Sequence, residues 1–264
     1  MSTESSSWDK SIEPIEAIVP RENIPDKLLR TCLDKSIDER QGFGWGVMSR
    51  GIEEFNREFQ PILPMSITEI LSERCQKGEP SAVLDVMGFG AILYQLRDKG
   101  IPFSHGFSLS LGHWANTWYH QLDQKRAQEK IIFHLTGNIL DQKLWETLFT
   151  EMKEKQTGKF GLVIWAPAGG FHPDFITNSL SIYNQLLQNV WSIISVTNGK
   201  ILAEIPPWVT TNHNQEFHTW LELLTKSDTG IKRHPFCRFL KYPRSNGGVM
   251  VLDKTPLRKN LPLI

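Results

Sequence analysis

Short apolar runs that alternate with helical segments constrain the fold of this 264-residue chain more than any other feature. Five runs rich in Val, Ile, Leu and Phe are each followed by a longer segment whose apolar residues have helical spacing. The predicted strands are 82–87, 103–109, 131–135, 160–165 and 200–205, and the predicted helices are 91–99, 115–130, 142–155, 174–195 and 214–225. Such alternation predicts a parallel sheet with helices on both faces.

The rhythm changes near the C-terminus. Segments 231–242 and 249–253 are two further strands, and the connection PRSNGG between them is too short for a helix. This turn chemistry predicts a hairpin, which adds an antiparallel strand to the sheet. The sequence therefore predicts an α/β fold: a three-layer, Rossmann-like, seven-stranded and mostly parallel sheet with a C-terminal antiparallel hairpin. Ligands of such sheets bind outside the carboxyl ends of the strands, where the strand order reverses.

The N-terminal part of the chain differs from this pattern. Residues 1–65 are predicted to be a flexible start and a helical N-terminal extension, and residues 66–264 the α/β domain. The start is rich in serine, acid and proline, and further short helices are predicted at 51–59 and 66–75. The segment GFGWG at 42–46 mixes aromatic residues with glycine hinges and is either a packed connector or part of a lid.

Composition gives no indication of a nucleic-acid-binding, membrane-bound or disulfide-rich secreted protein. Lysine plus arginine (29) equals aspartate plus glutamate (29), and this balance gives no indication of a nucleic-acid or membrane partner. The cysteines at 32, 75 and 237 are far apart, so neither a disulfide framework nor a metal site is predicted. No secretory signal or membrane-spanning apolar stretch is found, and a cytoplasmic setting is expected.

The first predicted strand leads into a glycine-containing turn. Asp85 follows the apolar run, and Gly88 and Gly90 allow the backbone to approach a ligand closely. Over residues 66–255 the order of elements resembles the class I S-adenosylmethionine-dependent methyltransferases. In that family an acid and a glycine-rich turn contact the methionine part of the cofactor. Met87 and Phe89 stand where that family has glycine, so the loop is either shifted by one residue or degenerate.

The resemblance extends to the next two strands. The family has a ribose-binding acid at the end of the second strand, where this chain has Ser108. After the third strand, Asn138 stands where an acid accepts from the adenine amino group, and Ile139 follows it. A serine hydroxyl and an asparagine oxygen can each accept such a bond, although the hydroxyl lacks the charge assistance of a carboxylate. For Ser108 the alternative is another register, in which Gly112 or His113 takes the place of the acid, and for Asn138 it is an ordinary loop with Asp141 capping the next helix.

After the fourth strand the family places residues that face the transferred methyl group. Trp165, Ala166 and Pro167 occupy this position and complete the predicted cofactor site. His172 follows them and is the predicted general base, because an imidazole titrates near neutrality. The alternative is a histidine in a surface loop.

Three functions compete. The resemblance implies a methyltransferase that uses S-adenosylmethionine and an unidentified, small or polar acceptor. The departures at Met87 and Ser108 favour instead a catalytically inactive, methyltransferase-like binding or regulatory protein. The third is a nicotinamide-dependent dehydrogenase, but Leu93 stands where GxGxxG requires its third glycine. The sequence indicates no particular acceptor and no oligomeric state.

Overall fold

The computed structural model describes most of the predicted α/β region. Its described residues are 52–86, 90–110, 130–137, 139, 141–165, 180–205, 222, 232–235, 248–255 and 261. The segment GFGWG lies outside these residues, and so do the predicted helices 115–130 and 214–225 except for one residue each.

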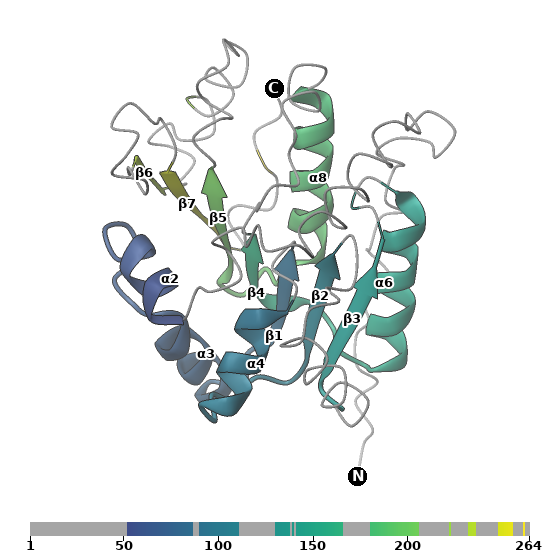
Figure 1. Cartoon of the computed structure of the whole chain (residues 1–264), viewed down its shortest axis with the longest axis horizontal. Coiled ribbons are helices and arrows are strands. Elements are labelled where there is room, and N and C mark those ends of the chain that lie inside the picture. The colour runs from purple at the N-terminus through teal and green to yellow at the C-terminus, as the bar shows by residue number, and fades with distance from the viewer. Residues whose placement is uncertain are drawn as a thin grey trace, which may run out of the picture.

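The sheet has seven strands in the order β3-β2-β1-β4-β5-β7-β6. These strands are β1 (Ala82–Val86), β2 (Gly106–Ser110), β3 (Ile132–Thr136), β4 (Phe160–Trp165), β5 (Gly199–Ile205), β6 (Lys232–Pro235) and β7 (Gly248–Lys254). The first five are parallel, and β7 lies antiparallel between β5 and β6. The predicted seven-stranded α/β fold with its terminal hairpin is confirmed, and the strand order reverses between β1 and β4 (Figure 1).

The strand bounds agree best where both faces of the strand are buried. β4 has the predicted bounds, and all six of its residues are buried. β2 begins at Gly106 and not at the predicted residue 103. Ile101 and Phe103 pack as partly buried side chains against the core instead of pairing in the sheet. Pro102 lies between them and has no N–H to give to a neighbouring strand, so the apolar run begins before the strand does.

Five described helices cover the sheet. They are α2 (Ile52–Phe59), α3 (Ile67–Gln76), α4 (Ala91–Asp98), α6 (Gln142–Glu154) and α8 (Leu180–Ile193). Figure 1 shows α4 in front of β1, and α6 and α8 on the opposite side of the sheet. Buried side chains of α2, α3 and α4 form one core cluster, and those of α6 and α8 form the other. The sheet is therefore the middle of three layers.

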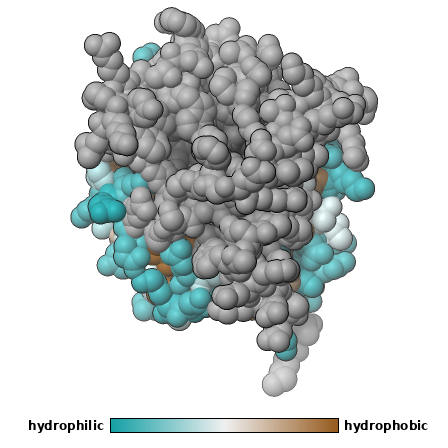
Figure 2. Space-filling model, viewed as in Figure 1, coloured by the Kyte–Doolittle hydropathy of each residue, from teal (hydrophilic) through white to brown (hydrophobic). Residues whose placement is uncertain are grey.

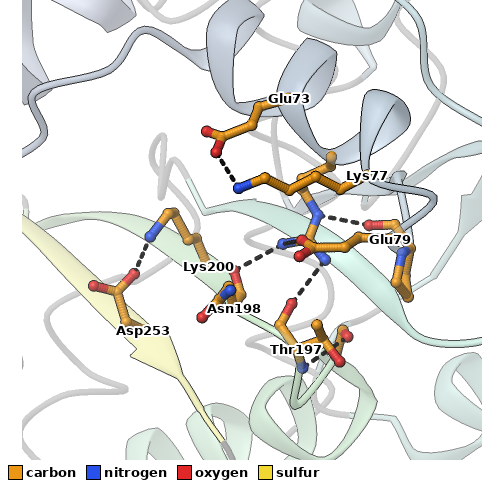
Figure 3. A network of polar contacts seen from close by, with 10 residues as sticks. Glu73, Lys77, Glu79, Thr197, Asn198, Lys200 and Asp253 are labelled. Carbon is orange, nitrogen blue, oxygen red and sulfur yellow. Dashed lines mark hydrogen bonds and ion pairs between the residues drawn. The ribbon is translucent and has the colours of Figure 1, made fainter.

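A buried arginine joins α3 to the amino edge of the sheet. Arg74 is 4% exposed, and its guanidinium donates to the carbonyls of Pro80 (2.6 Å), Asn198 (2.8 Å) and Thr197 (3.1 Å) (Figure 3). Glu79 lies 3.4 Å from the same group. Burial lowers the pKa of Arg74 from its usual value, and Glu79 opposes this shift. The guanidinium thus connects α3, the start of β1 and the turn before β5.

Two lysines bind the last carbonyls of α8. Lys254 Nζ donates to the carbonyl of Trp191 at 2.5 Å, and Lys159 Nζ donates to that of Ser192 at 2.6 Å. A cation is favourable at the C-terminus of a helix. Lys254 is nonetheless buried, and burial, followed by repulsion from Lys159, lowers its pKa to about 8.

On the face that Figure 2 shows, the described residues at the surface are mostly hydrophilic. Val196, at 46% exposure, is the exposed large hydrophobic residue of the described part. None of the described helices is long and apolar enough to cross a membrane.

Candidate functional site

Three polar side chains form a row across the sheet, with Asp85 next to the carboxyl end of β1 and Ser108 and His134 in the middle of β2 and β3. Asp85 of β1 is the register partner of Ser108 of β2, which in turn is the partner of His134 of β3. Side chains of a strand alternate between its faces, and Leu84 and Val86 belong to the core on the α6 and α8 side. The row therefore faces α4, in a layer that is otherwise mostly apolar.

Asp85 holds the start of α4. Its carboxylate is 1% exposed, and Oδ2 accepts from the backbone N–H of Gly90 at 2.6 Å. Gly90 is the N-cap of α4 and has φ 76° and ψ 4°, a left-handed conformation that favours glycine. The negative carboxylate thus lies at the positive end of the helix and bonds its N-cap amide.

Ser108 lies beneath the same turn. It is 0% exposed, and its hydroxyl has no hydrogen-bond partner among the described residues. A Cβ atom on Gly90 would lie 3.4 Å from the Cβ of Ser108 and 2.5 Å from Cε1 of His134. The predicted residues Asp85, Gly90 and Ser108 are therefore brought together at one place in the fold.

Two residues of this site were not predicted. His134 contacts Tyr94 of α4, whose hydroxyl lies 2.9 Å from its Nε2. The two rings stack, with centroids 5.6 Å apart and an interplanar angle of 11°. A histidine inside the apolar run IIFHLT was a signal for His134, but Tyr94 has no comparable mark in the sequence.

The other described residues of the predicted cofactor site, Trp165 and Ile139, lie on the face of the sheet that α6 and α8 cover. Trp165 ends β4 and is 1% exposed, and its side chain belongs to the core formed with α6 and α8. Ile139 packs against that core, and its carbonyl accepts from Trp145 Nε1 at 2.8 Å. Trp165 still pairs with Val86 at the point where the strand order reverses. Its predicted contact with a cofactor, like that of Ile139, stays a prediction.

The remaining predicted site residues lie outside the described residues. They are Met87, Gly88, Phe89, Asn138, Ala166, Pro167 and the predicted base His172. Within the described part of the chain, no group of three His, Cys, Asp or Glu side chains is arranged to hold a metal ion.

No protein-family profile matches the chain, and no curated protein matches it. Among solved structures it is similar to a Listeria monocytogenes protein assigned to the class I S-adenosylmethionine-dependent methyltransferases, with 12% identity, a TM-score of 0.48, and coverage of 93% of this chain and 73% of that one. An rRNA methylase from Streptococcus thermophilus has 10% identity, a TM-score of 0.42 and coverage of 71% and 93%.

A third similar structure is a protein from Streptococcus mutans assigned as a methyltransferase and solved with S-adenosylhomocysteine. It has 8% identity, a TM-score of 0.41, and coverage of 66% of this chain and 88% of that one. Because these identities are so low, the fold class of the chain rests on its own strand order. The chain has a seven-stranded α/β fold with an antiparallel terminal strand pair, which is the architecture that the resemblance to class I methyltransferases implied.

Proposed function

We propose that the protein transfers a methyl group from S-adenosylmethionine to a small or polar acceptor. The observation that carries the proposal is the Asp85 carboxylate at the N-terminus of α4. Asp85 Oδ2 already bonds the N–H of Gly90 at 2.6 Å. A buried negative charge in this position favours a cationic ligand at the first loop and disfavours an anionic one.

The same carboxylate favours S-adenosylmethionine over a nicotinamide dinucleotide as the cofactor. In dinucleotide-binding folds the pyrophosphate lies at the N-terminus of the helix after the first strand. Here a pyrophosphate would meet Asp85, and β2 offers Ser108, in the middle of the strand, where such folds have an acid for the ribose at the strand end. Both features disfavour the dehydrogenase interpretation.

The topology supports a cofactor site at this edge. The strand order reverses between β1 and β4, and Val86 and Trp165 are paired at the ends of these two strands. Ligands of open α/β sheets bind in the crevice outside such a point. Asp85, through Gly90, would fix the loop that bounds one side of this crevice, and Trp165 ends the strand on the other side.

When bound, S-adenosylmethionine supplies a methyl group on a positively charged sulfur, which makes the methyl electrophilic. The protein then has mainly to hold the acceptor atom in line with that methyl group. Asp85 and Gly90 would hold the cofactor loop in place. His172 is the proposed base for an acceptor that must lose a proton.

A second candidate function is that of a methyltransferase-like binding protein without activity. The observation that favours it is Ser108, which is fully buried and has a hydroxyl where the family has a ribose-binding carboxylate. A hydroxyl enclosed beneath Gly90 reaches a ribose only if the turn above it moves. Weak cofactor binding and no turnover would follow.

Calorimetric titration of the full chain with S-adenosylmethionine, S-adenosylhomocysteine and NAD tests the proposal. We expect micromolar binding of the two sulfur cofactors and none of NAD. Asp85→Asn keeps the shape of the side chain but removes its charge. Because a hydrogen bond to a charged group is worth about 1 kcal/mol more than a neutral one, we expect a roughly fivefold weaker affinity for the cationic S-adenosylmethionine.

Asp141→Asn is the matched control. Asp141 is the N-cap of α6, and its Oδ1 accepts from the N–H of Lys143 at 2.9 Å, so it makes the same kind of bond at another helix. It should leave cofactor affinity unchanged. Absence of binding of either sulfur cofactor to the wild type would refute the proposal, and binding without methylation of any acceptor tried would favour the second candidate.

A further inference from the structure

We propose that His134, held by Tyr94, is a positioning residue that sets the turn at Gly90 and thereby the bond from Gly90 to Asp85. The role of His134 in the turn stands on contacts within the chain. Only its expected effect on cofactor affinity rests on the proposed function.

The first contact is steric. The imidazole of His134 occupies the space beneath Gly90, so that a Cβ there would lie 2.5 Å from Cε1 and 3.3 Å from Nδ1. Atoms do not approach a Cβ so closely, and the turn therefore follows the ring beneath it. If the ring moves or is lost, the left-handed turn at φ 76° loses the surface on which it lies.

The second set of contacts fixes the imidazole. The Tyr94 hydroxyl lies 2.9 Å from Nε2 of His134, and the two rings are nearly parallel. The guanidinium of Arg97 lies 4.9 Å from the centroid of the Tyr94 ring, within the range of a cation–π contact. Tyr94 is itself buried, so its ring has neighbours that hold it in one orientation.

Tyr94 contacts both the imidazole of His134 and the turn at Gly90, so these contacts form a closed circuit. The backbone N–H of Tyr94 donates to the carbonyl of Gly90 at 3.2 Å, while the side chain of Tyr94 holds the imidazole under that same glycine. The N–H of Gly90 donates to Asp85. Gly90 is therefore held from the helix, from β3 and from β1 at once. Three elements that meet at one glycine make its orientation depend on the Tyr94–His134 pair.

Hydrogen exchange of the Gly90 amide measures this dependence directly. Tyr94→Phe removes only the hydroxyl, and we expect the Gly90 amide to exchange about fivefold faster, the factor that one hydrogen bond contributes. His134→Ala should have a larger effect at the same amide. Ser192→Ala, which removes a 2.7 Å bond from a hydroxyl to the carbonyl of Asn189 near the amino edge of the sheet, should leave Gly90 protected as in the wild type.

A double variant tests the steric contact. Gly90→Ala places a methyl group against the imidazole, and adding His134→Ala removes that obstacle. We expect the second substitution to restore part of the affinity for S-adenosylhomocysteine that the first removes. The left-handed backbone still disfavours alanine, so the rescue is incomplete.

The outcomes distinguish this inference from the proposed function. Unchanged exchange at Gly90 in both Tyr94→Phe and His134→Ala overturns the inference, whatever the cofactor does. Faster exchange supports the role of His134 in the turn. A roughly threefold to fivefold loss of affinity for S-adenosylhomocysteine in the same variants shows that the turn serves the cofactor site, and unchanged affinity overturns that link to the cofactor alone. If the wild type binds no S-adenosylhomocysteine, the proposed function fails, and the exchange comparison alone decides the role of His134.

Discussion

Replacing Arg74 with methionine tests whether α3 is an integral part of the core. The substitution keeps most of the buried volume but removes three hydrogen bonds, to Pro80, Thr197 and Asn198. Each bond to a charged donor is worth about 1.5–3 kcal/mol. The gain from no longer burying the charge, visible in the lowered pKa of Arg74, offsets part of that sum. We expect a net loss of about 3–5 kcal/mol in the free energy of unfolding.

Urea denaturation monitored by circular dichroism measures this loss, and thermal melting should show a Tm about 10 °C lower. Arg74→Lys keeps the charge without the planar fork, so an intermediate loss is expected. The matched control is Lys77→Met at the C-cap of α3, three residues after Arg74, where the ion pair with Glu73 is exposed and little change is expected (Figure 3). A loss below about 1 kcal/mol for Arg74→Met would refute the reasoning, because a buried guanidinium with three acceptors cannot be that dispensable.

Two further predictions concern stability. Because the pKa of Lys254 is about 8 when folded and 10.5 when unfolded, the unfolded chain binds more protons between these values, and stability rises with pH across this window. Between pH 7.5 and 10.5 the free energy of unfolding from urea denaturation should rise by up to about 3 kcal/mol less in Lys254→Met than in the wild type, and parallel curves for the two proteins would contradict this. Gly161→Ala places a methyl group against the carbonyl oxygen of Pro80, which is backbone and cannot give way, so we expect a clear drop in Tm. Gly137→Ala meets only the side chain of Leu144, and the one close atom is the terminal Cδ1 at 3.1 Å, so this variant should melt near the wild type. Equal melting of both variants would refute the steric argument.

The sequence predicted the sheet well because its central strands are buried on both faces. FGLVIW at 160–165 is apolar at every position except glycine, and β4 has those bounds. The start of β2 was wrong, because Ile101 and Phe103 are apolar for a different reason: they cover the core from outside the sheet. The pattern of apolar residues indicates which residues are buried, but it does not distinguish a residue inside a strand from one that covers the core from outside the sheet.

The site was predictable only in part. Asp85 and Gly90 stand at a strand end and a turn, where local sequence indicates a ligand loop, and Ser108 was found by its position in the second apolar run. The Tyr94–His134 pair depends on the register between β1, β2 and β3, which a single sequence does not give. Arg74 was missed for a related reason. A charged residue in an amphipathic helix predicts exposure, and its backbone acceptors at 197 and 198 are distant in the chain.

The position of β7 has a consequence for the order of assembly during synthesis. β7 is the last described strand in the chain, yet it lies inside the sheet and pairs with both β5 and β6. The edge of β5 that pairs with β7 stays open until β7 has been synthesised. The ends of the two strands are separated by roughly 50 residues, which the ribosome adds in about 2–10 s. That edge contains Ile201, Leu202 and Ala203, and an open apolar edge can pair with another chain. During this interval the nascent chain is exposed to aggregation through β5, and pairing with β7 ends it.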